Sequence, residues 1–194
     1  MDVTRLVVGP LATNCYILAA GDKRVIIDAG AGAEEIRAAL GGGEVLAIIA
    51  THGHNDHVDA VDSLVALTGA PFMVPAADAA LAGRSVETSA ATLLEDGATL
   101  DFPGISLDVI ATPGHTPGCV CLYAPPLLFS GDTLFAGGVG RFDLPGGSSD
   151  ALFDSIKERI FVLPDETDVL PGHGPATTVG REKRSNPFFS SAWV

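Results

Sequence analysis

The residues with the clearest chemical potential are histidines that cluster in one short segment. Three of the five histidines in the chain fall within His52-Gly53-His54-Asn55-Asp56-His57, together with an aspartate. Imidazole nitrogens and carboxylate oxygens are donors that proteins use for divalent metal ions. Crowded imidazoles would repel one another when protonated and would lose hydration when buried and neutral, unless a cation held them together. The segment therefore predicts a metal site.

Three further ligand-type residues follow strand-like runs later in the chain. Ser106–Ala111 precedes His115, Leu127–Phe129 precedes Asp132, and Asp168–Leu170 precedes His173. Each of these residues stands in a glycine-containing loop, and the first cluster likewise follows the apolar run Val45–Ala50. Open α/β sheets bind ligands at the carboxyl ends of their strands. We therefore expect the side chains to meet in one site at a common edge of the fold.

Each of these residues also has an ordinary structural interpretation. A single histidine in a glycine-rich loop is more often a surface or core residue than a metal ligand, which applies to His115 and His173 taken alone. Asp56 could cap the helix that follows it, and Asp132 could stabilise a turn. The concentration of ligand types at four strand ends favours a metal site over these separate explanations.

The surrounding sequence predicts the elements that bring these loops together. Apolar and β-branched runs predict strands, and apolar residues at helical spacing predict helices. The predicted strands are Thr4–Val8, Cys15–Ala20, Val25–Asp28, Val45–Ala50, Ser106–Ala111, Cys119–Tyr123, Leu127–Ser130 and Asp168–Leu170. The predicted helices are Glu34–Leu40, Val58–Thr68 and Ala151–Ile160. Meandering strands followed by alternating strands and helices predict a mixed α/β (α+β) fold, in which helices cover β-sheets from outside.

The composition of the 194 residues is that of a folded, acidic protein. Hydrophobic residues make up 47% of the chain, so we expect one domain spanning residues 1–194 and exclude disorder. The 24 Asp and Glu against 11 Lys and Arg give a formal net charge of −13, which argues against nucleic acid or an anionic membrane surface as a partner. The sequence does not indicate an oligomeric state.

Neither a membrane span nor a secretion signal is predicted. The longest apolar stretch, Cys119–Phe129, is interrupted by Pro125 and Pro126 and is shorter than the roughly 18 residues that a span needs. Asp2 stands where a signal peptide would have basic residues, so we expect a cytoplasmic location. The cysteines show neither disulfide nor zinc-site spacing and are expected in the core. They are Cys15, Cys119 and Cys121.

Several motifs resemble those of the metallo-β-lactamase superfamily. Its signature His-x-His-x-Asp-His corresponds to residues 52–57, and a histidine, an aspartate and a histidine follow in the same order. Within the superfamily the chain looks most like short, single-domain hydrolases of the glyoxalase II (hydroxyacylglutathione hydrolase) type. The stretches that carry this resemblance are Thr112–Gly118, Ser130–Phe135, Gly140–Asp143, Leu170–Gly174, Arg181–Lys183 and Asn186–Phe188.

The resemblance implies an αββα sandwich of two mixed β-sheets flanked by helices, with a site for two divalent metal ions between the sheets. By this analogy one metal is held by His52, His54 and His115, the other by Asp56, His57 and His173, and Asp132 bridges both. Zinc is the expected metal, and iron or manganese would also accept these ligands. Asp28 resembles a residue that supports the ligands, and a strand-terminating turn is an equal interpretation of it.

The resemblance also implies a hydrolytic function. A glyoxalase II-like thioesterase would cleave a small S-acylated thiol such as S-lactoylglutathione with metal-bound hydroxide, and Asp56 would orient that nucleophile. The alternatives are a lactonase of the same superfamily, a mononuclear iron persulfide dioxygenase and a metal-stabilised scaffold without turnover. β-Lactamases with this motif generally have cysteine or serine in place of the bridging aspartate, so Asp132 argues against antibiotic hydrolysis.

Two basic residues are candidates for substrate contacts through the same resemblance. Lys183 resembles a lysine that contacts the carboxylate of glutathione in glyoxalase II enzymes, and Arg141 lies in the shared stretch Gly140–Asp143. The alternative for the basic residues in 181–184 is a solvated surface or a helix end. Full-length glyoxalase II enzymes carry an additional C-terminal helical region that has no counterpart in these 194 residues. The sequence therefore leaves the thiol carrier open.

Overall fold

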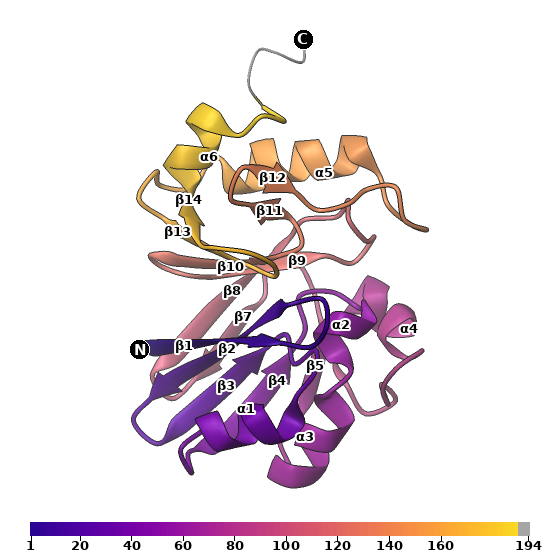
Figure 1. Ribbon diagram of the computed structural model, residues 1–194, viewed down its shortest axis with the longest axis vertical. Coiled ribbons are helices and arrows are strands. Elements are labelled where there is room, and N and C mark those ends of the chain that lie inside the picture. The colour runs from indigo at the N-terminus through magenta and orange to yellow at the C-terminus, as the bar shows by residue number, and fades with distance from the viewer. Residues whose placement is uncertain (190–194) are drawn as a thin grey trace.

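The computed structural model describes residues 1–189 and contains two six-stranded mixed β-sheets (Figure 1). The first sheet has the strand order β1 (Asp2–Val8), β2 (Thr13–Ala20), β3 (Lys23–Ile27), β4 (Glu44–Ile49), β5 (Phe72–Pro75) and β6 (Thr92–Leu94). The second has the order β14 (Thr177–Thr178), β13 (Asp168–Pro171), β10 (Leu127–Gly131), β9 (Val120–Ala124), β8 (Ile105–Ala111) and β7 (Thr99–Phe102). A hairpin of β11 (Leu134–Phe135) and β12 (Gly138–Val139) stands apart from both sheets.

Helices lie on the outer faces of the two sheets, with α1 and α3 on the first and α5 and α6 on the second (Figure 1). The α-helices are α1 (Ala33–Ala39), α2 (Asn55–Val58), α3 (Val61–Thr68), α4 (Ala79–Ala82), α5 (Ser149–Ser155) and α6 (Val179–Ser185). A 3-10 turn, η1 (Ala76–Asp78), precedes α4, and a π-helical turn, η2 (Ile156–Ile160), continues α5. None of the helices in residues 1–189 has the length and apolar character that crossing a membrane requires.

Alternation along the strands distributes buried side chains over three hydrophobic layers. In β3, Ile26 packs with the helices of the first sheet, whereas its neighbours Val25 and Ile27 point between the sheets. In β10, Phe129 joins the layer between the sheets, and Leu128 packs outward with residues of α5 and η2. A period of two with both faces buried is what the central strands of a sandwich require. The predicted αββα architecture is therefore confirmed.

The predicted helices differ from the structure in their boundaries. The helix expected over residues 58–68 is two helices, α2 and α3, because the chain turns at Ala60, whose amide donates to the carbonyl of Ala29. The helix expected over residues 151–160 begins earlier, where Ser148 accepts a hydrogen bond from the Ala151 amide and caps the first turn. Its last turn is the π-helical η2.

Several short elements had no clear sequence signal. Strands β5, β6, β7, β11, β12 and β14 and helices α4 and α6 were not predicted. Most have two to four residues, too few to display a period, and they form because neighbouring strands and loops supply their hydrogen-bond partners. The three cysteines are free and buried, as predicted. Burial raises the pKa of Cys121 to about 11, so this thiol stays protonated at neutral pH.

Candidate metal centre

The seven predicted ligands lie at one edge of the sandwich, where strands of both sheets end. Loops after β4, β8, β10 and β13 carry them, and Asp56 and His57 lie within the short helix α2. Strands β10 and β13 are parallel, and β8 runs in the same direction because β9 is antiparallel to both β8 and β10. This shared direction brings the loop ends of the second sheet to one edge.

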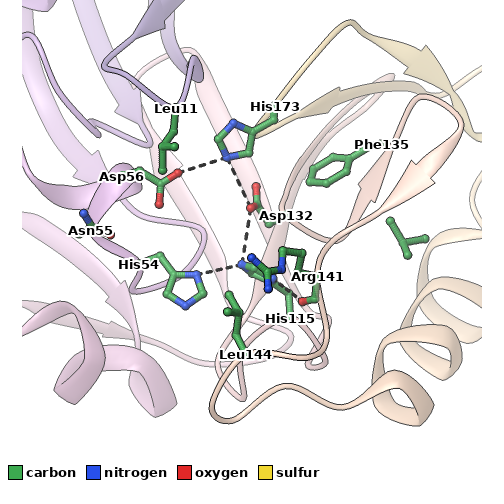
Figure 2. A pocket seen from close by; sticks show the side chains of 11 residues that line it. Leu11, His54, Asn55, Asp56, His115, Asp132, Phe135, Arg141, Leu144 and His173 are labelled. Carbon is green, nitrogen blue, oxygen red and sulfur yellow. Dashed lines mark hydrogen bonds and ion pairs between the residues drawn. The ribbon is translucent and has the colours of Figure 1, made fainter.

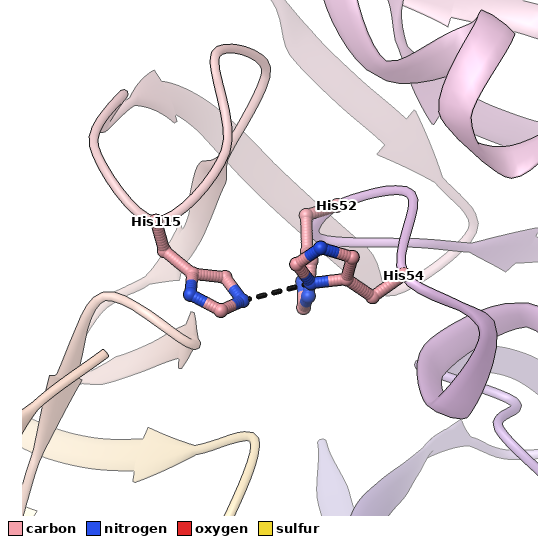
Figure 3. Close-up of side chains that lie close together, drawn as sticks. All are labelled: His52, His54 and His115. Carbon is pink, nitrogen blue, oxygen red and sulfur yellow. Dashed lines mark hydrogen bonds between the residues drawn. The ribbon is translucent and has the colours of Figure 1, made fainter. Parts of the chain in front are cut away.

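The ligand atoms form three groups, and the atoms within each group all lie within 4.8 Å of one another. The groups are His52, His54 and His115; His52, His57 and Asp132; and Asp56, His57 and His173. Figure 3 shows the first group, in which the three imidazoles converge from two loops. His52 and His57 each belong to two groups. The groups therefore adjoin and form one cluster with room for more than one cation.

Asp132 lies between the two outer groups. Its Oδ2 is 3.5 Å from Nε2 of His115 and 3.6 Å from Nε2 of His173 (Figure 2), and its Oδ1 is 3.4 Å from Nε2 of His57. The other carboxylate, Asp56, has Oδ2 3.2 Å from Nε2 of His173 and 3.6 Å from Nε2 of His57. Asp132 thus contacts histidines of both outer groups, whereas Asp56 contacts histidines of one.

Within residues 1–189, four side-chain atoms of the ligand residues are buried without a hydrogen-bond partner: Nε2 of His52, Nδ1 and Nε2 of His57, and Oδ1 of Asp132. Of these, Nδ1 of His57 lies beside Asp28, on the opposite side of its ring from Nε2. Buried polar atoms are normally hydrogen-bonded, and an unpartnered group in a native structure calls for a specific explanation such as an ion. Imidazole nitrogens with carboxylate oxygens are a donor set that suits zinc, iron or manganese. The residues present therefore fit a divalent metal site.

Asp28 orients two of these histidines from behind. It accepts hydrogen bonds from the amide and the hydroxyl of Thr51, at 2.8 and 2.9 Å, and its Oδ2 lies 3.1 Å from Nδ1 of His57. Because the Thr51 hydroxyl donates to Asp28, its oxygen is left to accept from Nδ1 of His52, 3.2 Å away. Protons on both Nδ1 atoms leave the Nε2 lone pairs of His52 and His57 facing the cluster. The position of Asp28 fits the supporting role that the resemblance implied.

A backbone carbonyl orients His115 in the same way. Nδ1 of His115 lies 2.6 Å from the carbonyl oxygen of Arg141, which can only accept. The proton of the neutral ring is therefore on Nδ1, and Nε2 faces Asp132 and His54. The nearest His54 nitrogen, Nδ1, is 2.9 Å from this Nε2. Arg141 thus contributes to the cluster through its main chain, which its side-chain chemistry did not predict.

A buried carboxylate that the sequence did not single out ties two ligand loops together. Asp78 is 1% exposed and accepts hydrogen bonds from the Gly53 amide at 2.9 Å, the Thr116 hydroxyl at 2.6 Å and the Gly118 amide at 2.8 Å. The first donor lies between two ligand histidines, and the other two follow His115. Asp78 therefore fixes the loops that carry all three members of the first group. No local motif marks it, because its partners are remote in sequence.

The first residues of β2 hold the ligand loop that carries His173. The Asn14 side chain donates to the carbonyls of Pro171 and Gly174, at 2.8 and 2.9 Å, on either side of His173. The Thr13 hydroxyl, 3.2 Å from Oδ2 of Asp56, donates to that carboxylate. These contacts position His173 and Asp56 relative to each other, and they too join segments that are distant in sequence.

The charges of the cluster follow from burial and mutual contact. Burial and the neighbouring imidazoles lower the pKa of His52 well below its usual value, and burial with His115 lowers the pKa of His54. Burial opposes the charged forms of His57 and Asp132, but nearby charges have the larger effect. Asp28 and Asp132 raise the pKa of His57, and His57 lowers the pKa of Asp132. The contact with Asp132 therefore favours positive charge at His57, the charge that a cation bound at its Nε2 would supply.

The cluster forms the floor of an open cavity of about 470 Å³ (Figure 2). His54, Asp56, His115, Asp132 and His173 face it, and its walls include the apolar residues Leu11, Phe135, Val139 and Leu144. Arg141 also lines it, with its guanidinium paired to Asp143 at 2.9 Å. The cavity has the mixed character of a small-molecule site, in which apolar walls surround a few polar groups.

The structure does not bring Lys183 to this cavity. Its ammonium lies 2.7 Å from Oδ1 of Asp165 and 3.2 Å from the carbonyl oxygen of Leu163, and Lys183 does not line the cavity. These contacts connect α6 to the loop before β13. The sequence resemblance placed it near His173 in order but could not give the direction of its helix.

Comparison with known proteins agrees with this arrangement. The chain is 38% identical to the probable metallo-hydrolase YqgX of Bacillus subtilis, with 98% of each covered, and 32% identical to the hydroxyacylglutathione hydrolase GloC of Haemophilus influenzae, with 98% of this chain and 99% of GloC covered. Among solved structures, the BLEG-1 B3 metallo-β-lactamase has a TM-score of 0.87 at 37% identity, covering 98% of this chain and all (100%) of that one. TTHA1623 in a di-iron-bound form has a TM-score of 0.86 at 41% identity, covering 95% and 99%.

The family is identified by a separate match, to a family profile. Residues 8–173, which include all seven candidate ligands, match the profile of the metallo-beta-lactamase superfamily. Together with the sandwich fold and the histidine and aspartate cluster at its edge, this shows that the chain belongs to the metallo-β-lactamase superfamily, whose members include metal-dependent hydrolases.

Proposed function

We propose that this protein is a binuclear metal-dependent hydrolase that cleaves small thioesters. The observation that carries the proposal is the set of buried atoms without a hydrogen-bond partner in residues 1–189, Nε2 of His52, Nε2 of His57 and Oδ1 of Asp132, in a cluster whose other members line an open cavity together with Asp132. Similarity to the hydroxyacylglutathione hydrolase GloC over nearly the full length of both chains supports the substrate class. The proposal takes one metal to be held by His52, His54 and His115, the other by Asp56, His57 and His173, with Asp132 shared.

Bound divalent cations would supply Lewis acidity at the acyl carbonyl and hydroxide near neutral pH. The protein's own residues do the positioning. Asp28 and the Arg141 carbonyl fix the ring orientation of three ligand histidines, so the site needs little rearrangement during reaction. Asp56, held by Thr13, would orient the nucleophile. A thiolate leaves without strong acid assistance, so a thioester needs no additional proton donor in the cavity.

The cavity walls suit a substrate that is apolar near the scissile bond. Leu11, Phe135, Val139 and Leu144 would exclude water from the acyl group and the sulfur atom. Arg141 stands at the rim, with a side chain that is 67% exposed and already paired with Asp143. We propose that it contacts the substrate, and the paired Asp143 will weaken its attraction for an anion.

The test is a turnover screen of the purified protein after loading with zinc, iron or manganese. We expect hydrolysis of S-lactoylglutathione or a related thioester to exceed that of lactones. Consumption of oxygen with glutathione persulfide, by protein that contains one iron and hydrolyses no thioester, would replace this proposal with the dioxygenase alternative.

A second candidate is β-lactam hydrolysis, because the BLEG-1 B3 metallo-β-lactamase resembles this chain over its whole length. Asp132 distinguishes the two candidates, since β-lactamases that resemble this motif generally have cysteine or serine in its place. The screen therefore includes a penicillin and a carbapenem. Faster turnover of either than of any thioester would favour this second candidate.

Asp78 provides a prediction about the first metal position. Asp78→Asn keeps the size of the side chain but removes a charged acceptor from three donors on two ligand loops. Changes in groups that position metal ligands typically reduce metal affinity about 10- to 100-fold, and we expect a loss in that range. Competition with a chromophoric chelator measures it directly on the metal-free protein.

The matched control is Asp154→Asn, which makes the same chemical change at an exposed position on α5. Its metal affinity should equal that of the wild type. If Asp78→Asn also binds metal with wild-type affinity, the hydrogen bonds of Asp78 do not position the first group of ligands.

A further inference from the structure

A second cavity adjoins the candidate metal centre on the side of His54. It has a volume of about 350 Å³ and is lined by Gly53, His54, Asn55, Leu81, Arg84, Ser85, Leu144 and Pro145. His54, Asn55 and Leu144 also line the larger cavity, and Figure 2 shows these three residues along one side of it. The two cavities therefore meet at His54, one of the candidate ligands. A substrate longer than its reacting group would extend from one into the other.

The second cavity contains a cation that is not neutralised by the protein. The side chain of Arg84 is exposed, and no carboxylate in the described residues 1–189 lies within 4.0 Å of its guanidinium. Most of the other cations have such partners, in a chain whose formal net charge is −13. Arg141, the arginine of the larger cavity, is paired with Asp143. Arg84 is thus the arginine beside the centre that is free to bind an anion.

The backbone around Arg84 is anchored against a ligand loop. The Gly83 amide donates to the Ala79 carbonyl at 2.9 Å, and the Val86 amide donates to the Ala82 carbonyl at 3.1 Å, which closes the turn after α4. A Cβ atom added at Gly53 would lie 2.8 Å from the Ala82 nitrogen, so α4 packs directly on the loop between His52 and His54. Arg84 is therefore attached to an element whose place relative to the centre is fixed.

We propose that this second cavity is a subsite for the anionic end of the substrate, and that Arg84 is the residue that recognises it. The proposal rests on the hydrolase function proposed above and extends it to the substrate's remote group. A planar guanidinium binds a carboxylate or a phosphate with two parallel hydrogen bonds. Leu81, Leu144 and Pro145 provide apolar walls for the carbon chain between that anion and the thioester. The substrate class is thus a thioester that carries a carboxylate or a phosphate at a distance from its sulfur.

The test measures binding of thioether ligands, which resemble the substrate but cannot be hydrolysed. Isothermal titration compares wild type, Arg84→Gln and Arg181→Gln, all loaded with metal. The ligands are S-hexylglutathione, its dimethyl ester, and S-hexyl-4′-phosphopantetheine, which present carboxylates, no anion and a phosphate respectively. Arg181→Gln is the matched control, because it makes the same change in net charge at an exposed residue of α6 that lines neither cavity.

We expect Arg84→Gln to weaken binding of an anionic ligand roughly three- to tenfold, the range for a partly exposed charge-assisted contact. Binding of the dimethyl ester should stay unchanged. A loss confined to S-hexylglutathione identifies a carboxylate as the anion, and a loss confined to the pantetheine ligand identifies a phosphate. The subsite would be overturned if Arg84→Gln weakened binding of the dimethyl ester as much as binding of the anionic ligands. It would also be overturned if Arg181→Gln weakened binding of the anionic ligands equally, or if Arg84→Gln bound both anionic ligands with wild-type affinity.

The same titration keeps this inference separate from the hydrolase proposal. Turnover of a neutral thioester, S-acetyl-N-acetylcysteamine, is measured on the wild type and depends on the metal centre but not on Arg84. If the wild type binds the thioethers but hydrolyses no thioester, the proposed reaction is refuted. The subsite is then still tested by comparing ligand binding between the wild type and Arg84→Gln. A wild type that hydrolyses the neutral thioester, with Arg84→Gln unchanged toward every ligand, refutes the subsite alone.

Discussion

Replacing Asp132 with alanine is expected to lower thioester turnover by roughly a thousandfold, equivalent to about 4 kcal/mol of transition-state stabilisation. Asp132 contacts histidines of both outer ligand groups, so its loss weakens both proposed metal positions and the spacing between them. It would also remove one of the three carboxylates, those of Asp28, Asp56 and Asp132, that lie within 4.0 Å of the buried His57 ring. Steady-state kinetics with elemental analysis of the same sample measure both effects.

The comparison is with single histidine variants such as His54→Ala and His173→Ala, each of which removes a ligand from one outer group. Asp132→Ala should lose more metal and more activity than either. A variant with near-normal metal content and turnover would show that Asp132 is only a turn residue after β10, and the shared position would be wrong.

The second large effect is expected from Gly140→Ala. A Cβ atom at this position would overlap the carbonyl oxygen of Asp132 and lie 3.2 Å from Cβ of His115. The backbone that carries Asp132 and His115 would have to move. Displacements of about 1 Å in a catalytic constellation can cost about 100-fold in rate, and overpacking typically costs about 1–3 kcal/mol of stability. We expect losses of that size in kcat and in the free energy of unfolding.

Gly138→Ala is the control for Gly140→Ala, in the same hairpin region and two residues away. A Cβ atom there would meet only Cβ of Phe135, at 3.8 Å, so activity and stability should stay close to wild type. Denaturant unfolding and turnover of both variants would be compared. Wild-type activity in Gly140→Ala would mean that the close approach of this loop to Asp132 is not needed for the site.

The sequence contained much of the fold and of the ligand set because both depend on local patterns. Alternating apolar residues such as Val25, Ile26 and Ile27 predict a strand buried on both faces, and the strand defines where the next loop begins. Histidine and aspartate in those loops then predict a common site. The same logic predicted β8 and β10, each of which differs from its predicted bounds by one residue at one end.

The remaining features depend on contacts between segments that are distant in sequence. Asp78 looks like any aspartate at the start of a helical turn, and only the fold brings Gly53 and Thr116 to its carboxylate. Thr51 has no motif beyond its position before His52. Its hydroxyl nevertheless links Asp28 to Nδ1 of His52 and so orients that imidazole ring. For Lys183, a motif suggested a substrate contact, and the fold places its ammonium beside Asp165.

The proposed binuclear centre holds two metal ions that act together on a thioester. Its most direct test is titration of the metal-free protein with zinc, with bound metal and turnover of S-lactoylglutathione followed in the same samples. We expect about two zinc ions per chain at saturation, with activity rising mainly as the second position fills. Saturation at one metal per chain with full activity, or binding of two without any thioester turnover, would contradict it.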